Sequence, residues 1–292
     1  MKNINKIKND IEKFIERVDV PYQNYLLNNQ EKYSKSIYSL EYFYFVTNYI
    51  STMKFSSVDD ELVLLGLFTK ASMDLYGIHY CLKHGLETQA QQIARGLYET
   101  YITVELILKE DVNARLKLFH DFHHIQRWNH VDFNMKINSE YDLNGFYSNP
   151  EYLKKLNENF EEVKNNYHPK SPTHWAWKIF KDKVKNRNPS MLDICRYLGD
   201  FYLNEYAMTY PTASLSSHPN QVVADYFKKS DKERNVIVNA PNYTNLTINI
   251  SGISLGYCSK ITNNILNYFK ITDYKNIIEF INYFVAEAVE IE

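Results

Sequence analysis

The sequence predicts an all-α protein, a helical bundle with an N-terminal helical extension, and three observations indicate this fold class. Apolar residues recur at three- and four-residue intervals through most of the 292 residues, which is the period of an amphipathic helix. Only residues 235–239 alternate like a strand, and this run is too short to found a sheet. No period of about 20 to 50 residues repeats, which argues against a solenoid. We expect the extension to cover residues 1–55 and the bundle residues 56–292.

The expected helices in the first part of the chain are each bounded by a recognisable residue. Pro21 closes the first helix, and Gly85 breaks the third. Ser57 and the acidic residues after it are typical of a capped helix start. The fourth helix is apolar almost all round, which predicts a central place in the core. These helices are expected over 6–18, 25–53, 57–84 and 88–109.

The second part of the chain alternates between helical patterns and polar sequence. A connector over 133–174 is rich in Asn, Tyr and Pro, and we expect it to be a variable lid that holds one short helix. The helices expected here cover 111–132, 151–164, 175–184, 190–198, 202–217, 243–270 and 274–290.

Composition excludes several classes of protein. The formal charge of −2 gives no global attraction to nucleic acid or anionic lipid. Three cysteines that are far apart argue against disulfides and zinc sites, and a reducing cytoplasm fits best. No apolar run is long enough for a signal peptide or a membrane span. We therefore expect a cytoplasmic protein that contacts no membrane and needs no cofactor.

A polar row runs along the helix expected over 202–217. Every fourth residue carries a hydroxyl or an imidazole, so the row stays on one side of a helix. Pro211 is expected to kink or break the helix, and Pro219 should leave the imidazole before it at a helix end. The row either grips a ligand or consists of half-buried tyrosines whose hydroxyls bond at the rim of the core. Its members are Tyr202, Tyr206, Tyr210, Ser214 and His218.

Arg95 and Glu99 lie one turn apart on the apolar fourth helix. On an exposed surface such a pair contributes only about 0.3–0.5 kcal/mol. Charges are rarely buried unless they are paired or used, so the pair either organises a polar pocket or is an ordinary salt bridge.

Two further segments contain candidate ligands of different kinds. The histidines within 120–130 include His120 and His124 one turn apart, but the segment lacks the H-E-x-x-H arrangement and a clear third ligand at a fixed spacing, so no metal site is predicted. Cations and tryptophans interleave over 175–187, and Lys178 and Lys181 are candidate contacts for an RNA backbone. A solvated helix face is the plainer explanation of this basic segment.

Several short motifs in order resemble a widespread bacterial family of helical proteins of unknown function. The resemblance covers about residues 60–270. The motifs are Arg95-Gly-Leu-Tyr-Glu99, Asn113-Ala-Arg115, His174-Trp175, Cys195-Arg-Tyr-Leu-Gly199, and the row Tyr206-x3-Tyr210-x3-Ser214-x3-His218-Pro219.

That family is similar in plan to the HEPN superfamily of helical bundles. The similarity implies a HEPN-like homodimer and a metal-independent endoribonuclease, as found in toxins and antiphage defence effectors. The superfamily motif is R-x4–6-H, and Arg115 and His120 are the only pair with that spacing. In this hypothesis His218 acts as base or acid, and Arg95 or Arg115 stabilises the charge on the phosphorane.

A second hypothesis is a non-catalytic helical module that binds a nucleotide, a peptide or a partner protein. It is motivated by the near-neutral charge and by the absence of an R-x4–6-H arginine before His218. The pocket would be formed by Arg95 and Glu99 together with the same row of tyrosines, serine and histidine, including Tyr206, Tyr210, Ser214 and His218.

Overall fold

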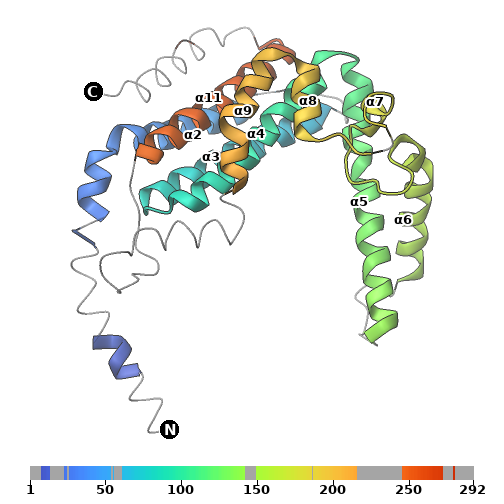
Figure 1. The fold of residues 1–292 in the computed structure, drawn as a ribbon, viewed down its shortest axis with the longest axis horizontal. Coiled ribbons are helices and arrows are strands. Elements are labelled where there is room, and N and C mark those ends of the chain that lie inside the picture. Colours follow the sequence, from blue (N-terminus) through green and yellow to red (C-terminus); the bar gives the residue numbers. More distant parts are fainter. Residues whose placement is uncertain are drawn as a thin grey trace. The chain divides into compact units, whose positions relative to one another are not determined.

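The computed structural model describes residues 8–13, 23–24, 26–53, 55, 61–141, 149–185, 187–215, 245–271 and 279, and at 138–141 and 212–215 it describes the backbone alone. The elements named within these residues are helices, which confirms the all-α fold class (Figure 1). They are α2 (Ser34–Ser51), α3 (Leu62–Lys83), α4 (Glu87–Lys109), α5 (Val112–Tyr141), α6 (Pro150–Val163), the 3-10 helix η2 (Lys164–Asn166), α7 (Trp177–Phe180), α8 (Met191–Leu198), α9 (Asp200–Leu215) and α11 (Asn245–Tyr268).

Three of the expected helices differ from those observed. Helix α5 continues to Tyr141, well into the predicted connector. Helix α7 is only four residues long, and Lys185 beyond it has a φ of 40°, a conformation that does not continue a helix. Helix α9 runs through Pro211 to Leu215, so the prediction of a break there is wrong, and the alternative of a kink stays a prediction. Because Ala207, one turn before the proline, is exposed, water can bond the carbonyl that the proline leaves without a donor.

Two helix starts show why the chain becomes helical where it does. The Asn149 side chain accepts from the backbone N–H groups of Glu151 and Tyr152, and Pro150 has the fixed φ that suits a first helical position. Ser190 and Asp193 form a capping box at α8, in which each side chain bonds the backbone of the other residue. Both starts lie within a few residues of the boundaries that the sequence predicts.

The chain divides into two compact units. Unit 1 contains residues 1–54, 68–101 and 209–292, and unit 2 contains residues 55–67 and 102–208. Helices α3, α4 and α9 have residues in both units. The extension over residues 1–55 remains a prediction as a separate domain.

In unit 1, α11 packs against α2. Figure 1 shows these two helices side by side. The buried face of α11 is rich in small residues such as Ser251, Ser254 and Cys258, which allow helices to approach closely. Side-chain hydrogen bonds also join distant segments within this unit. The Thr47 and Ser72 hydroxyls lie 2.5 Å apart, and Gln30 donates to the Lys83 carbonyl at 2.8 Å. The unit is therefore fixed by side-chain hydrogen bonds as well as by apolar contact.

In unit 2, α5 packs against α6. Trp128 of α5 stacks on Phe160 of α6 with ring centroids 5.6 Å apart. The buried Tyr167 closes the end of this pair by donating its hydroxyl to the Leu118 carbonyl at 2.8 Å. Burial raises the pKa of Tyr167 far above its usual range, so this hydroxyl stays a donor.

The hydropathy of the described helices tests whether any of them could span a membrane. Within the described ranges, no helix is both long enough and apolar enough to cross a bilayer.

We predict that Asp193→Asn destabilises the protein at neutral pH and makes its free energy of unfolding depend less on pH in the acid range. Arg187 donates to both carboxylate oxygens, at 2.7 and 2.9 Å, and this pairing holds the pKa of Asp193 far below its usual range. A group with a lowered folded pKa stabilises above its unfolded pKa of about 3.9 and loses that contribution as pH falls further. Loss of the cap should cost about 0.5–2 kcal/mol at pH 7.

Urea denaturation at pH 7 and at pH 3 measures this effect. The difference in unfolding free energy between wild type and variant should shrink at the lower pH. The half-exposed Asp132, paired with Lys136 on α5, offers a control in Asp132→Asn. A penalty for Asp193→Asn that is the same at both pH values would contradict the electrostatic explanation.

Candidate functional site

Four carboxylates on α4 or just after it share one kind of partner. Each accepts a hydrogen bond from a hydroxyl that lies much later in the chain but in the same unit. As the carboxylates advance along the sequence, their partners occur in reverse order. The pairs are Glu87 with Thr247 at 2.6 Å, Glu99 with Tyr210 at 2.8 Å, Glu105 with Tyr202 at 2.7 Å, and Glu110 with Tyr197 at 2.7 Å.

One of these carboxylate–hydroxyl pairs, Glu99 with Tyr210, also includes a half-exposed cation, Arg95. We call these three residues the Arg95 cluster. Arg95 Nε donates to Glu99 Oε1 at 3.1 Å, as expected for residues one turn apart. Its Nη2 donates to the Tyr210 hydroxyl at 2.9 Å, and that hydroxyl donates in turn to Glu99 Oε1. The three side chains therefore form a closed ring of hydrogen bonds.

The electrostatics of the Arg95 cluster favour binding over proton transfer. Burial, followed by the bond to Glu99, raises the pKa of Tyr210, so its hydroxyl stays protonated near neutral pH. The guanidinium is charged at any physiological pH. The Arg95 side chain is 30% exposed and that of Glu99 41%, so the ring faces solvent on one side.

An aromatic group lies beside the Arg95 cluster in unit 1. The Tyr210 ring lies 4.9 Å from the Arg95 guanidinium carbon, a cation–π distance. Tyr98 joins this ring to Tyr257, with centroids 5.7 and 5.1 Å away. Lys260 places a second cation 6.0 Å from the Tyr257 ring. Two cations thus flank one continuous set of tyrosine rings.

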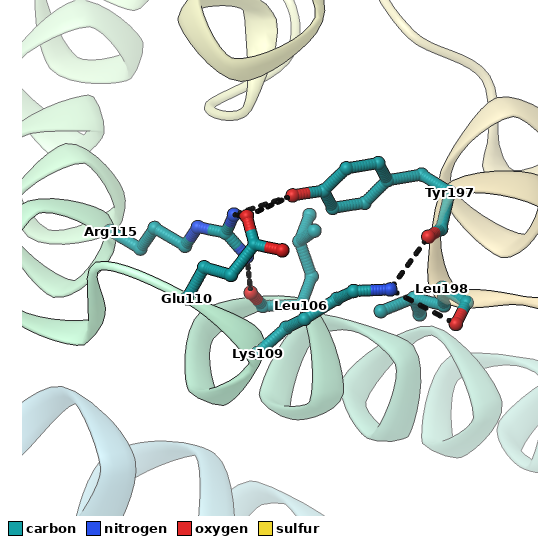
Figure 2. Close-up of polar contacts among 6 residues, drawn as sticks. All are labelled: Leu106, Lys109, Glu110, Arg115, Tyr197 and Leu198. Carbon is teal, nitrogen blue, oxygen red and sulfur yellow. Dashed lines mark hydrogen bonds and ion pairs between the residues drawn. The ribbon is translucent and has the colours of Figure 1, made fainter.

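Arg115 lies in a different environment from Arg95, and Figure 2 shows the residues around it. Its side chain is buried, and its Nη1 donates to the Leu106 carbonyl at 2.5 Å. Its Nη2 donates to Glu110 at 3.2 Å and to the Tyr197 hydroxyl at 2.8 Å. These bonds tie the turn between α4 and α5 to α8, which gives Arg115 a structural role in unit 2.

Tyr197 is the centre of this second network. Lys109 donates to the carbonyls of Tyr197 and Leu198 at 2.7 and 3.1 Å, where a cation suits the end of α8 (Figure 2). The Lys183 ammonium lies 4.0 Å from the Tyr197 ring centroid. The hydrogen bond from Tyr197, followed by the nearby cations, lowers the pKa of Glu110. The carboxylate therefore stays ionised as the counter-ion of this network.

The histidines of α5 lie near one another without forming a metal site. His123 Nδ1 lies 2.5 Å from the His120 carbonyl, and the rings of His123 and His124 are 3.8 Å apart. Burial, followed by the charge of His123, lowers the pKa of His124. Among the described residues, no group of three or more His, Cys, Asp or Glu side chains could hold a metal ion.

The basic segment over 175–187 is partly core and partly solvated. Trp175 is buried against Phe119, with ring centroids 5.3 Å apart. Lys178 is exposed and donates to Asn166 at 2.8 Å, and Lys181 is exposed. This arrangement fits the plainer explanation of a solvated face beside core tryptophans.

The structure brings together only part of the predicted site. Arg95, Glu99 and Tyr210 converge, whereas the Arg115 guanidinium bonds Leu106, Glu110 and Tyr197. Tyr206 is half-buried on α9. His218 and the side chain of Ser214 lie outside the described residues. The predicted joint action of His218 with Arg95 or Arg115 therefore stays a prediction.

Sequence reasoning missed three residues that organise these networks. Tyr197 lies in the motif Cys195-Arg-Tyr-Leu-Gly199, but no spacing rule points from it to Glu110. Tyr257 and Lys260 carried no signal beyond the helical pattern of their segment. Their roles depend on contacts between residues about 90 to 160 positions apart in the chain.

We predict that Tyr197→Phe destabilises the protein by about 1–3 kcal/mol, because the buried Arg115 loses an acceptor and Glu110 loses a donor. Equilibrium denaturation in urea measures the loss. Tyr80→Phe is the matched control, since Tyr80 is 55% exposed. Equal unfolding free energies for Tyr197→Phe and wild type would show that the network around Tyr197 contributes nothing to stability.

Comparison with known proteins gives one match. The model of a family of unknown function, DUF5677, matches residues 61–234, which is more than half of the chain. This match confirms the resemblance to an uncharacterised family. No curated protein and no solved structure matches the chain. The wider similarity to the HEPN superfamily stays a prediction.

Proposed function

We propose that this chain, which belongs to the DUF5677 family, is a helical module that binds a phosphate-bearing ligand of the nucleotide class at the Arg95 cluster. The proposal rests on the chemistry of the cluster, because the family itself has no known function. One observation carries it: a half-exposed guanidinium is held in place by both a carboxylate and a tyrosine hydroxyl.

The held guanidinium has donors to spare. An arginine carries five N–H groups, and the described contacts of Arg95 use one on Nε and one on Nη2. The planar fork of a guanidinium matches the oxygens of a phosphate. Because Glu99 and Tyr210 already fix the side chain, less conformational entropy is lost when a ligand binds.

The tyrosines beside Arg95 favour a nucleotide over a simple anion. The half-buried Tyr210 ring lies against the guanidinium and could offer an edge or face to a base, and it is backed by the buried Tyr98, which in turn contacts the buried Tyr257. Aromatic rings stack on nucleobases, with a contribution of about 1–3 kcal/mol per base. A ligand with both a phosphate and a base would therefore use both features of the site.

We predict that nucleoside triphosphates raise the melting temperature of the wild type and not of Arg95→Ala. A ligand at about 100 times its Kd stabilises by roughly 2.7 kcal/mol, and roughly 2–4 °C per kcal/mol is expected for a chain of this size class. Differential scanning fluorimetry with ATP, GTP, CTP and UTP measures the shift. Arg95→Lys should give a smaller shift, because it keeps the charge and loses the fork.

Arg127→Ala is the matched control, because Arg127 is an exposed arginine on α5. It should respond to nucleotides as the wild type does. Equal shifts in Arg95→Ala and wild type would place the ligand elsewhere, and the lack of any shift with all four nucleotides would end the proposal.

A second candidate function is a HEPN-like, metal-independent endoribonuclease, in a toxin or an antiphage effector. The observation that favours it is the continuity of α9 through Pro211 to Leu215, three residues before His218. A row that continued to His218 would add a proton-transfer group to the phosphate-binding Arg95. Of the two candidate arginines, Arg115 is buried and makes three structural hydrogen bonds, which favours the half-exposed Arg95 as the partner of the phosphorane.

We predict for this second function that purified protein cleaves RNA in EDTA and that His218→Ala lowers the rate by about 10²–10⁴-fold. Labelled single-stranded RNA resolved on denaturing gels measures the rate, and circular dichroism checks the fold. His130→Ala changes an exposed histidine of α5 and should cleave normally. Intact RNA with the wild type, or equal cleavage by His218→Ala, would rule out this function.

A further inference from the structure

Helix α2 carries a row of large aromatic side chains on its exposed face. Tyr38, Tyr42, Phe45 and Tyr49 are 60%, 49%, 59% and 62% exposed. Their spacing of four, three and four residues is that of the contact seam in a coiled coil. We propose that this aromatic row is the interface through which two copies of the chain associate, with the two α2 helices antiparallel about a two-fold axis.

The aromatic row is held rigidly by the packing of α2 on α3. The buried His79 of α3 bonds the Ile37 carbonyl at 3.0 Å, and the hydroxyls of Thr47 and Ser72 meet nearby. Tyr44 of α2 stacks on Tyr76 of α3 with centroids 4.5 Å apart. A helix face that is ordered before association loses little entropy on binding.

The charge of this face suits contact with another protein surface. Across the 18 residues of α2, Lys35 is the only charged residue that is exposed. The other exposed residues of the helix are Tyr38, Tyr42, Phe45, Asn48, Tyr49 and Ser51. Interface cores are depleted in charge and rich in tyrosine and phenylalanine, whereas helices that lie on membranes carry many lysines and arginines. The face therefore fits a protein partner.

The symmetry of the spacing favours a second copy of this chain as that partner. A spacing of four, three and four reads the same in both directions, so a two-fold axis between Tyr42 and Phe45 places each ring opposite a ring of the other copy. Tyr38 then faces Tyr49 of the second copy, and Tyr42 faces Phe45. The two Lys35 residues lie at opposite ends of the paired helices, so no like charges meet.

The aromatic row and the neighbouring part of α3 together offer enough apolar area for a specific interface between two copies. Four aromatic side chains that are about half exposed offer roughly 450 Å² per copy, since each buries about 150–250 Å² when covered. The exposed Met73, Tyr76 and Tyr80 of α3 extend the apolar surface beyond the stacked Tyr44. The total for two copies then exceeds the roughly 1,000 Å² that a specific interface needs.

The first experiment measures mass in solution. Light scattering coupled to size exclusion should give the mass of a dimer for the full chain, and Tyr42→Glu with Phe45→Glu should weaken association by at least tenfold, because four acidic groups then meet. Tyr42→Lys with Phe45→Glu should restore the dimer, since opposite charges face each other across the axis. Phe133→Glu changes a 60% exposed aromatic of α5 and should leave the dimer intact.

The second experiment tests the antiparallel register. In a Cys81→Ser background, Tyr38→Cys mixed with Tyr49→Cys should form a disulfide-linked dimer on mild oxidation, and neither variant alone should do so. Cys195 and Cys258 are buried and should not interfere.

The outcomes separate the proposal from its alternatives. A monomeric wild type would overturn it, and a loss of melting temperature in Tyr42→Glu would then indicate that another segment of the same chain covers the row. A dimer that survives Tyr42→Glu with Phe45→Glu would place the interface elsewhere. Crosslinking of Tyr38→Cys to itself would show parallel helices and would overturn the two-fold arrangement.

Discussion

The structure depends on the hydrogen bonds that join the carboxylates of α4, and Glu110 just after it, to hydroxyls from later segments of the chain. Removing a carboxylate from water is costly unless it is hydrogen-bonded, and here hydroxyls supply bonds to the buried Glu87, the half-exposed Glu99 and Glu105, and the exposed Glu110. Hydroxyl donors satisfy the carboxylates without burying an equal number of cations. Because each donor lies beyond residue 190, these bonds fix, within each unit, the register of the described late helices against α4 or the turn after it.

This constraint separates the two arginines that the sequence presents as alternatives. Arg115 lies where its guanidinium is enclosed by a carbonyl, a carboxylate and a hydroxyl, so its donors serve the fold. Arg95 lies one turn from its carboxylate at a half-exposed position, so its donors are only partly used. The same residue type therefore has a structural role in one network, whereas in the other it is the residue to which we assign the proposed ligand.

The tyrosines of α9 and those of α2 have two different roles in this chain. On α9, Tyr202 and Tyr210 use their hydroxyls to bond the carboxylates of α4, so their rings lie against the core. On α2, Tyr38 and Tyr49 present their rings to solvent in a charge-poor row. Tyrosine suits both places because its ring is apolar and its hydroxyl is a neutral donor. Abundance of tyrosine alone does not reveal which role each one takes.

The sequence by itself determined the helical fold class, most helix boundaries and the pairing of Arg95 with Glu99, because these depend on residues within a few turns of one another. It also placed the hydroxyl row of α9 on one side of a helix. Only the tertiary structure decided that Tyr210 meets Arg95, that Arg115 is enclosed, and that the rings of α2 face outward. Helical periodicity shows which residues share a face, but the partner of that face is set by packing between distant segments of the chain.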